Sequence, residues 1–328
     1  MYKLKQLPND FIVKEKLSLK KEYGNYFYFS MKKIGLTTEQ AIGKITKILN
    51  ISRRSIGYAG NKDKNAITYQ KISIKSRKQL EKFKIDRDNL TLKLVGKGKT
   101  PISLGSLTKN HFEITVRNIT KKPNQIIAFP NYFDAQRFSK NNAEIGKLII
   151  KREFKKVTKL LGENHYCVKE YSQKKSTDFV GAIRTLPIKI IMLYIHSYQS
   201  KLFNRLLNNH IKENYKHKTI KTSFGELSFH LEEIKQIKLP LIGFETKEIS
   251  EVIEILKKEN ITLRDFIIRQ LPNLSQPGQL RQGFKNISDL KISNIKDDEL
   301  NKNKKKIILS FSLSKGSYAT MVVKALFL

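Results

Sequence analysis

One acidic residue, Asp63, stands between Lys62 and Lys64, just after the turn formed by Tyr58-Ala59-Gly60. Nearby positive charge favours the ionised form of a carboxylate. A charged carboxylate held on a defined turn suits a nucleophile or a general base. It suits a plain surface ion pair equally well, and charge alone favours that simpler interpretation. Asp63 is therefore a candidate catalytic residue that needs support from the rest of the chain.

The elements that must position Asp63 are short strands and one helix. Segments rich in β-branched and aromatic residues predict strands over 10–13, 26–29, 69–74, 91–95, 112–116, 307–311 and 320–323. Thr37 or Thr38 can cap a helix that runs through Asn50. Helical periodicity in the middle of the chain predicts helices over 143–161, over 180–214 with a break near Pro187, over 251–259 capped by Ser250, and over 263–271 capped by Thr262. A helical insertion thus interrupts a sheet to which both chain ends contribute strands.

The composition points to a polyanionic partner. The 328 residues include 64 Lys and Arg against 29 Asp and Glu, and the formal net charge of +35 is spread along the whole chain. Such a field attracts nucleic acid, although the base composition of an AT-rich genome would also add lysines without any function. A membrane surface is the competing partner, but no apolar run approaches the roughly 20 residues of a spanning helix. No signal-peptide pattern opens the chain, so we expect a cytoplasmic protein.

Metal and nucleotide-cofactor chemistry find no support in the sequence. Cys167 is the only cysteine, and the six histidines show neither HxxxH nor HxH spacing. The segment 96–100, Gly-Lys-Gly-Lys-Thr, lacks the spacing of a phosphate-binding loop. We expect neither a metal nor a cofactor.

Five segments, in order along the chain, resemble the signature elements of the TruD family of tRNA pseudouridine synthases. They are Tyr58–Gln70 around Asp63, Lys5–Phe11, Leu104–Arg117, Pro130–Phe138 and Gly316–Thr320. The segment Ser197–Asn204 resembles a helix of the same family. Because the five elements are ordered and span almost the whole chain, the protein is identified as similar to this family.

The resemblance implies a reaction on RNA. It is the isomerisation of a uridine in tRNA, preferably uridine 13, to pseudouridine without a cofactor. The C1′–N1 bond breaks, the uracil turns, and C5 joins C1′. Asp63 matches the essential aspartate, and whether it attacks the sugar or takes a proton from it stays open. Lys5 matches a basic residue that pairs with and orients the aspartate, although by itself it resembles a solvated lysine near a terminus.

Further residues are implied to contact the substrate. Phe112 matches the active-site aromatic on which an extruded base stacks, whereas its alternation with Ile114 and Val116 alone predicts a core position. Asn110 can hydrogen-bond a uracil edge or brace the catalytic loop. The other residues expected at the substrate are Lys62, Arg137 (a phosphate contact), Gly316 and Tyr318.

The implied fold is α+β. A pseudouridine synthase core with a mixed, mainly antiparallel sheet comprises residues 1–127 and 284–328, and a helix-rich TruD domain is inserted at 128–283. By resemblance, tRNA binds a basic cleft between them, and we expect a monomer. Asn9 and Lys324 replace a usual Glu and Arg, which leaves Lys5 more dependent on Asp63 and removes bidentate geometry at position 324. The alternatives are a non-catalytic RNA chaperone and a synthase that acts on another uridine.

Overall fold

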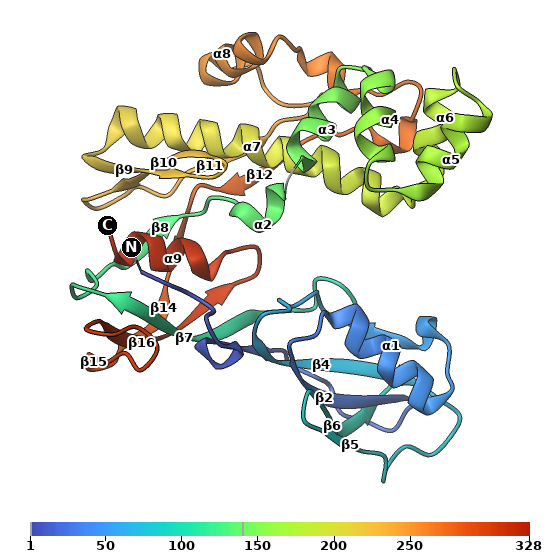
Figure 1. The fold of residues 1–328 in the computed structure, drawn as a ribbon, viewed down its shortest axis with the longest axis vertical. Coiled ribbons are helices and arrows are strands. Elements are labelled where there is room, and N and C mark those ends of the chain that lie inside the picture. Colours follow the sequence, from blue (N-terminus) through green and yellow to red (C-terminus); the bar gives the residue numbers. More distant parts are fainter. Residues whose placement is uncertain (1, 140) are drawn as a thin grey trace. The chain divides into compact units, whose positions relative to one another are not determined.

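The computed structural model describes residues 2–139 and 141–328. The chain forms two compact units. Unit 1 comprises the chain up to Gln125 together with Asn286–Ala319 and Phe327, and unit 2 comprises Ile126–Lys285 with Thr320–Leu326 and Leu328. A large sheet dominates unit 1 and helices dominate unit 2 (Figure 1), so the α+β class is confirmed.

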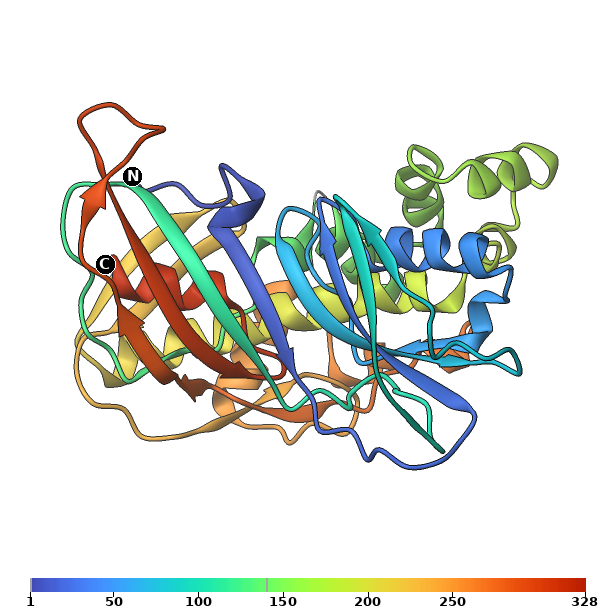
Figure 2. The ribbon, with the colours of Figure 1, turned by 90° about the horizontal axis from the view of Figure 1, so that it is seen from below.

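Unit 1 is built on a ten-stranded sheet with the order β14-β16-β7-β1-β4-β2-β6-β5, to which β15 adds beside β16 and β3 beside β4. Its strands are β1 (Phe11–Lys16), β2 (Tyr26–Ile34), β3 (Ile56–Tyr58), β4 (Ile67–Lys75), β5 (Ile85–Arg87), β6 (Leu90–Gly98), β7 (Lys109–Ile119), β14 (Ser288–Ile292), β15 (Lys296–Asp297) and β16 (Lys305–Ser314). Only the pair β1–β4 is parallel. Strands from both chain ends, β1 and β16, lie on either side of β7 in this sheet (Figure 2), which confirms the predicted sheet.

One face of this sheet is covered by α1 (Thr38–Leu49) (Figure 1). The predicted cap is correct, because Thr37 Oγ1 accepts a hydrogen bond from Gln40 N at 3.1 Å. Alternate residues of β2, Phe27, Phe29 and Met31, point toward the apolar face of α1 and are buried with it. Period-two alternation on the strands and a 3.6-residue period on the helix thus meet in one core.

Unit 2 is built around the long helix α7. Its helices are α2 (Ala135–Phe138), α3 (Asn142–Ile150), α4 (Phe154–Gly162), α5 (Tyr166–Lys174), α6 (Phe179–Arg184), α7 (Ile188–Asn214), α8 (Ser250–Glu259) and most of α9 (Ala319–Leu326). The 27 residues of α7 span roughly 40 Å. Gly146 lets α3 approach α7 closely, because a Cβ there would lie 2.1 Å from Tyr194 O. Pro187 precedes α7, at the predicted break.

Three short strand pairs complete unit 2. They are β8 (Ala128–Pro130) with β13 (Phe284–Asn286), β9 (His217–Thr222) with β10 (Gly225–His230), and β11 (Lys238–Leu241) with β12 (Gln279–Gln282). Within the described residues, no helix has the length and apolarity needed to cross a membrane.

Some predicted elements were wrong. Residues 320–323 lie in α9, where consecutive residues from Met321 to Val323 are all buried, so burial overrides their strand propensity. The predicted helix 263–271 is a single 3-10 turn, Leu263–Phe266, because the backbone beyond it bonds to residues 275 and 276 instead. Ser250 is the first residue of α8 rather than its cap.

Candidate active site

The Asp63 carboxylate and the Lys5 ammonium form an ion pair, with Lys5 Nζ 2.6 Å from Asp63 Oδ2. Both side chains are about one quarter exposed, at 26% for Lys5 and 25% for Asp63. The same ammonium lies 4.1 Å from the centre of the Phe11 ring, a cation–π contact. The two residues predicted to act together are therefore in contact, and the carboxylate remains accessible from solvent.

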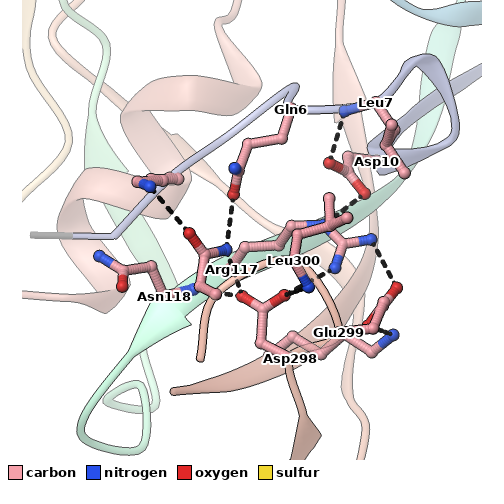
Figure 3. A network of polar contacts seen from close by, with 11 residues as sticks. Gln6, Leu7, Asp10, Arg117, Asn118, Asp298, Glu299 and Leu300 are labelled. Atoms are coloured by element: carbon pink, nitrogen blue, oxygen red, sulfur yellow. Dashed lines mark hydrogen bonds and ion pairs between the residues drawn. The ribbon is translucent and has the colours of Figure 1, made fainter. Parts of the chain in front are cut away.

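The segment that carries Lys5 is anchored on both sides. Lys3 forms two backbone hydrogen bonds with Arg117 of β7, at 2.8 and 3.0 Å. The buried Arg117 guanidinium donates from Nε to Asp10 (2.8 Å) and from Nη1 to Asp298 (2.9 Å), as Figure 3 shows. Lys5 itself has a left-handed backbone, with φ of 57°. Because its neighbours are tied to β7, this conformation is held in place and the ammonium is directed to Asp63.

The same network fixes the charge of Asp298. Burial alone would raise the pKa of this carboxyl group, but hydrogen bonds from Asn118 N, Asn301 Nδ2, Leu300 N and Arg117 lower it to about 2. Asp298 is thus a buried anion at neutral pH, and the Arg117 cation compensates it.

A buried lysine supports the backbone of the loop that carries Asp63. Lys33, at the end of β2, is 0% exposed. Its Nζ donates to the carbonyl oxygens of Asp63 and Leu36, each at 2.7 Å. Burial lowers the pKa of Lys33 to about 8, the Asp63 carboxylate opposes that shift, and Lys62 adds to it. The backbone of Asp63 is therefore fixed independently of its side chain.

Lys62 anchors the other side of the loop. Its ammonium lies 2.9 Å from Glu15 Oε1, and both side chains are almost fully buried. The second Glu15 oxygen accepts from Lys71 N at 2.8 Å. Lys62 N donates to Thr38 Oγ1 of α1 at 2.9 Å. This geometry favours a structural role for Lys62 over the predicted contact with substrate.

Phe112 and Asn110 project from β7 on the same sheet face as Phe11. The Phe112 ring is 7% exposed, stacks on Phe311 at 5.6 Å between centroids, and meets Phe11 edge-on at 6.1 Å. Phe11 in turn lies against Lys5, so this aromatic cluster adjoins the ion pair. Asn110 Oδ1 is buried and has no hydrogen-bond partner within the described residues. A buried unsatisfied carbonyl is costly and calls for a partner.

Comparison with known proteins identifies the family. The family model "tRNA pseudouridine synthase D (TruD)" matches residues 2–174, 156–223 and 222–326. A protein of Nanoarchaeum equitans named "Probable tRNA pseudouridine synthase D" is 34% identical over 99% of this chain and 98% of its own length. The tRNA pseudouridine synthase D of Aquifex aeolicus is 32% identical over 99% and 98%. A crystal structure described as the "Putative tRNA pseudouridine synthase D (TruD)" of Methanosarcina mazei superposes with a TM-score of 0.73, at 26% identity over 98% of this chain and 92% of that one.

The chain belongs to the TruD family. It is a tRNA pseudouridine synthase, an enzyme that isomerises a uridine of tRNA, and the recognition made from the five sequence elements is confirmed. The match over nearly the full length of both compared chains also confirms the pseudouridine synthase fold.

The structure distributes the remaining predicted residues of this TruD enzyme over both units. Gly316, with φ of 79°, makes the turn after β16, and Tyr318 follows it. The neighbouring Lys315 donates to Gly105 O at 3.3 Å, close in sequence to Asn110. Arg137 belongs to unit 2, where its Nε donates to Ser200 Oγ at 3.1 Å. Lys324 keeps an ion pair with Asp134, at 2.9 Å.

Sequence reasoning missed the residues that support the loop of this TruD enzyme. The most important are Lys33, Glu15, Thr38 and Gln70, and Gln70 Nε2 donates to Gly60 O at 3.4 Å. A signal was available, because Lys33 continues the inward positions 27, 29 and 31 of its strand. A charged residue at an inward strand position indicates a buried polar contact.

Proposed function

We propose that Asp63 is the catalytic carboxylate of this enzyme and that uridine 13 of tRNA is its target. Unit 1 would then be the catalytic core, with the segment between its two parts inserted as a TruD domain. The observation that carries the proposal is the 2.6 Å Lys5–Asp63 ion pair on a loop whose backbone is fixed by Lys33. The target position rests on the resemblance of the motifs, and the loop geometry supports the role of Asp63.

Different residues contact the loop backbone and the carboxylate of Asp63. Lys33 and Lys62 hold the loop backbone, while Lys5 pairs with Oδ2 of the Asp63 carboxylate. The reaction is balanced within the nucleoside: the C1′–N1 bond breaks, the C5–C1′ bond forms, the proton leaves C5, and N1 gains a proton. No electrons are gained or lost overall, which supports a reaction without a redox cofactor. Asp63 attacks C1′ or removes a sugar proton in this scheme.

Asn110 and Phe112 are proposed to receive the uracil. The unpaired Asn110 Oδ1 can accept a hydrogen bond from N3–H of a uracil. Phe112 stacks on Phe311 and lies next to Phe11, so it provides an aromatic surface beside the ion pair. An enzyme that acts on a base must extrude it from the RNA stack and hold it in a pocket, and such pockets use stacking and edge hydrogen bonds.

The first test replaces Asp63 and leaves the fold intact. We expect Asp63→Asn to abolish pseudouridine formation under single-turnover conditions and to keep tRNA affinity within about threefold. Asp86→Asn, at an exposed position on β5 of the same unit, is the matched control and should keep full activity. Pseudouridine formed by the Asp63→Asn protein at the wild-type rate would disprove the proposed role of Asp63.

Two further measurements address the target and the role of the carboxylate. Primer extension after carbodiimide treatment of a tRNA transcript should stop at position 13, and a transcript with cytidine there should give no stop. A stop elsewhere would assign another uridine. Deuterium at C2′ of the target should slow the reaction if Asp63 removes the sugar proton, and should leave the rate unchanged if Asp63 attacks C1′.

A further inference from the structure

Unit 2 contains a polar cavity that the chemistry at Asp63 does not use. Its volume is about 300 Å³, the size expected for a small ligand of one nucleotide. Four segments form its walls: the end of α2, the middle of α7, the last residue of β11, and the loop that leads into β12. The lining includes Arg137, His196, Gln199, Ser200, Leu241 and residues 276–279.

The walls of this cavity are rigid. Gly243 and Gly278 touch so closely that a Cβ on Gly243 would lie 2.3 Å from Gly278 N, and Gly278 has φ of 94°. Phe244 N donates to Gln276 O at 2.9 Å, and Gln199 Nε2 donates to Ile242 O at 2.8 Å. These contacts join the loop 276–279 to the segment 242–244 after β11, and join that segment to α7, so the cavity exists before any ligand binds.

The chemistry of the lining selects an anion that can also form hydrogen bonds. Among the described residues of the lining, Arg137 supplies the one permanent positive charge and none is acidic. His196 Nε2 lies 3.2 Å from Gln276 Oε1. Burial and the nearby Arg137 cation lower the pKa of His196, so its ring is neutral at pH 7. One cation beside neutral amide, hydroxyl and imidazole groups suits a phosphate joined to a base.

We propose that this cavity binds one unpaired nucleotide of the tRNA substrate, with the phosphate at Arg137 and the base among the groups of α7 and the loop 276–279. In an enzyme that acts on tRNA, the RNA itself is the source of such a ligand. The inference rests on tRNA being the substrate, and it deepens the proposed function by adding a second point of contact in unit 2. It does not depend on which uridine reacts.

Binding measurements on matched variants test the site. Arg137→Gln removes the positive charge, and Arg137→Lys keeps the charge but loses the planar guanidinium. His196→Ala removes the imidazole. Loss of a charge-assisted hydrogen bond predicts about tenfold weaker tRNA binding for Arg137→Gln. We expect a smaller loss for Arg137→Lys and a several-fold loss for His196→Ala. Lys189→Gln, an exposed position on α7, is the control and should bind like the wild type apart from a slight general charge effect.

Crosslinking separates this site from catalysis and from folding. tRNA carrying 4-thiouridine is bound to the inactive Asp63→Asn protein, irradiated and digested. Mass spectrometry should find a crosslinked nucleotide on the peptides that contain His196 or residues 276–279. This readout needs no turnover, so it stands if the assignment of Asp63 fails, and it needs no change in unit 2. Absence of such crosslinks, or Arg137→Gln binding within twofold of Lys189→Gln, would overturn the proposal.

Discussion

Replacement of Lys33 by methionine is the most informative perturbation of the loop that carries Asp63. The change keeps the length and apolar stem of the side chain but removes the ammonium that bonds the Asp63 and Leu36 carbonyls at 2.7 Å. Lys33 touches Asp63 only through the backbone in these contacts. The variant therefore tests whether the position of the loop, rather than the chemistry of a side chain, controls the reaction.

The expected effects on stability and on activity differ in size. Losing two hydrogen bonds from a charged donor costs roughly 1.5–3 kcal/mol each. Against this loss, the lowering of the Lys33 pKa from 10.5 to about 8 means that the buried ammonium itself costs on the order of 3 kcal/mol. The two contributions largely offset each other, so we expect the free energy of unfolding to change by less than about 3 kcal/mol. A loop displaced by ~1 Å, in contrast, can lower the rate about a hundredfold.

Single-turnover rates and tRNA affinities of Lys33→Met are measured beside those of Lys32→Met. Lys32 directly precedes Lys33 on β2, so its side chain points to the other sheet face. Its ammonium lies 5.9 Å from the centre of the Tyr69 ring. We expect Lys32→Met to keep the wild-type rate, and Lys33→Met to lose about two orders of magnitude in rate with little loss of affinity. A Lys33→Met rate within threefold of the control would refute this account of the loop.

The pH dependence of unfolding gives an independent check on Lys33. Its folded-state pKa of about 8 lies below the ordinary value of 10.5, so between these values the unfolded chain binds the proton and the folded chain does not. Stability contributed by this group therefore rises with pH in that window, by up to about 1.4 kcal/mol per pH unit. Urea unfolding of wild type and Lys33→Met at pH 7 to 10 should show the wild type gaining relative to the variant. A constant difference would contradict the buried, easily deprotonated lysine.

Two further predictions concern buried ion pairs. Arg117→Met leaves the buried carboxylates of Asp10 and Asp298 without their cation, so we expect a loss of about 3–5 kcal/mol in urea unfolding and a lower rate through a loosened Lys5 segment. An unchanged midpoint would contradict it. In unit 2, hydrogen bonds led by Lys147 outweigh burial and lower the pKa of Glu259 to about 2. Stability from Glu259 is present above pH 4.5 and lost as pH falls toward 2, so the difference between wild type and Glu259→Gln should shrink on acidification.

Local sequence patterns predicted much of unit 1 because its elements follow simple periodicities. The cap at Thr37, the helix that ends at Asn50 and the alternation of β2 are all visible in the sequence. The predicted strand over 320–323 was wrong for a physical reason, because these residues belong to the C-terminal helix α9. Its residues 319–326 are apolar almost throughout, and such a short run fits a buried strand or a buried helix equally well. Only packing decides between them, and packing is not local.

The pairing of Lys5 with Asp63 was accessible only through the family resemblance. The two residues lie 58 positions apart, and neither has a spacing that predicts contact. The anchoring of Lys5 depends on Arg117 and Asp298, whose side chains meet although they are 181 positions apart. Such pairs arise from the register of β7 with both chain ends, which the sequence alone does not set.

The polar residues of the sheet that contact the loop show what the alternation of side chains along a strand can predict. Glu15, Lys33 and Gln70 occupy the same sheet face as the apolar core, on β1, β2 and β4. Burying polar groups there is unfavourable unless each has a partner, and the backbone of the Asp63 loop is a partner for two of them. In this conformation the loop carbonyls of Gly60 and Asp63 accept hydrogen bonds from Gln70 and Lys33. The polar residues of the sheet therefore help to set the position of the Asp63 carboxylate through the loop backbone.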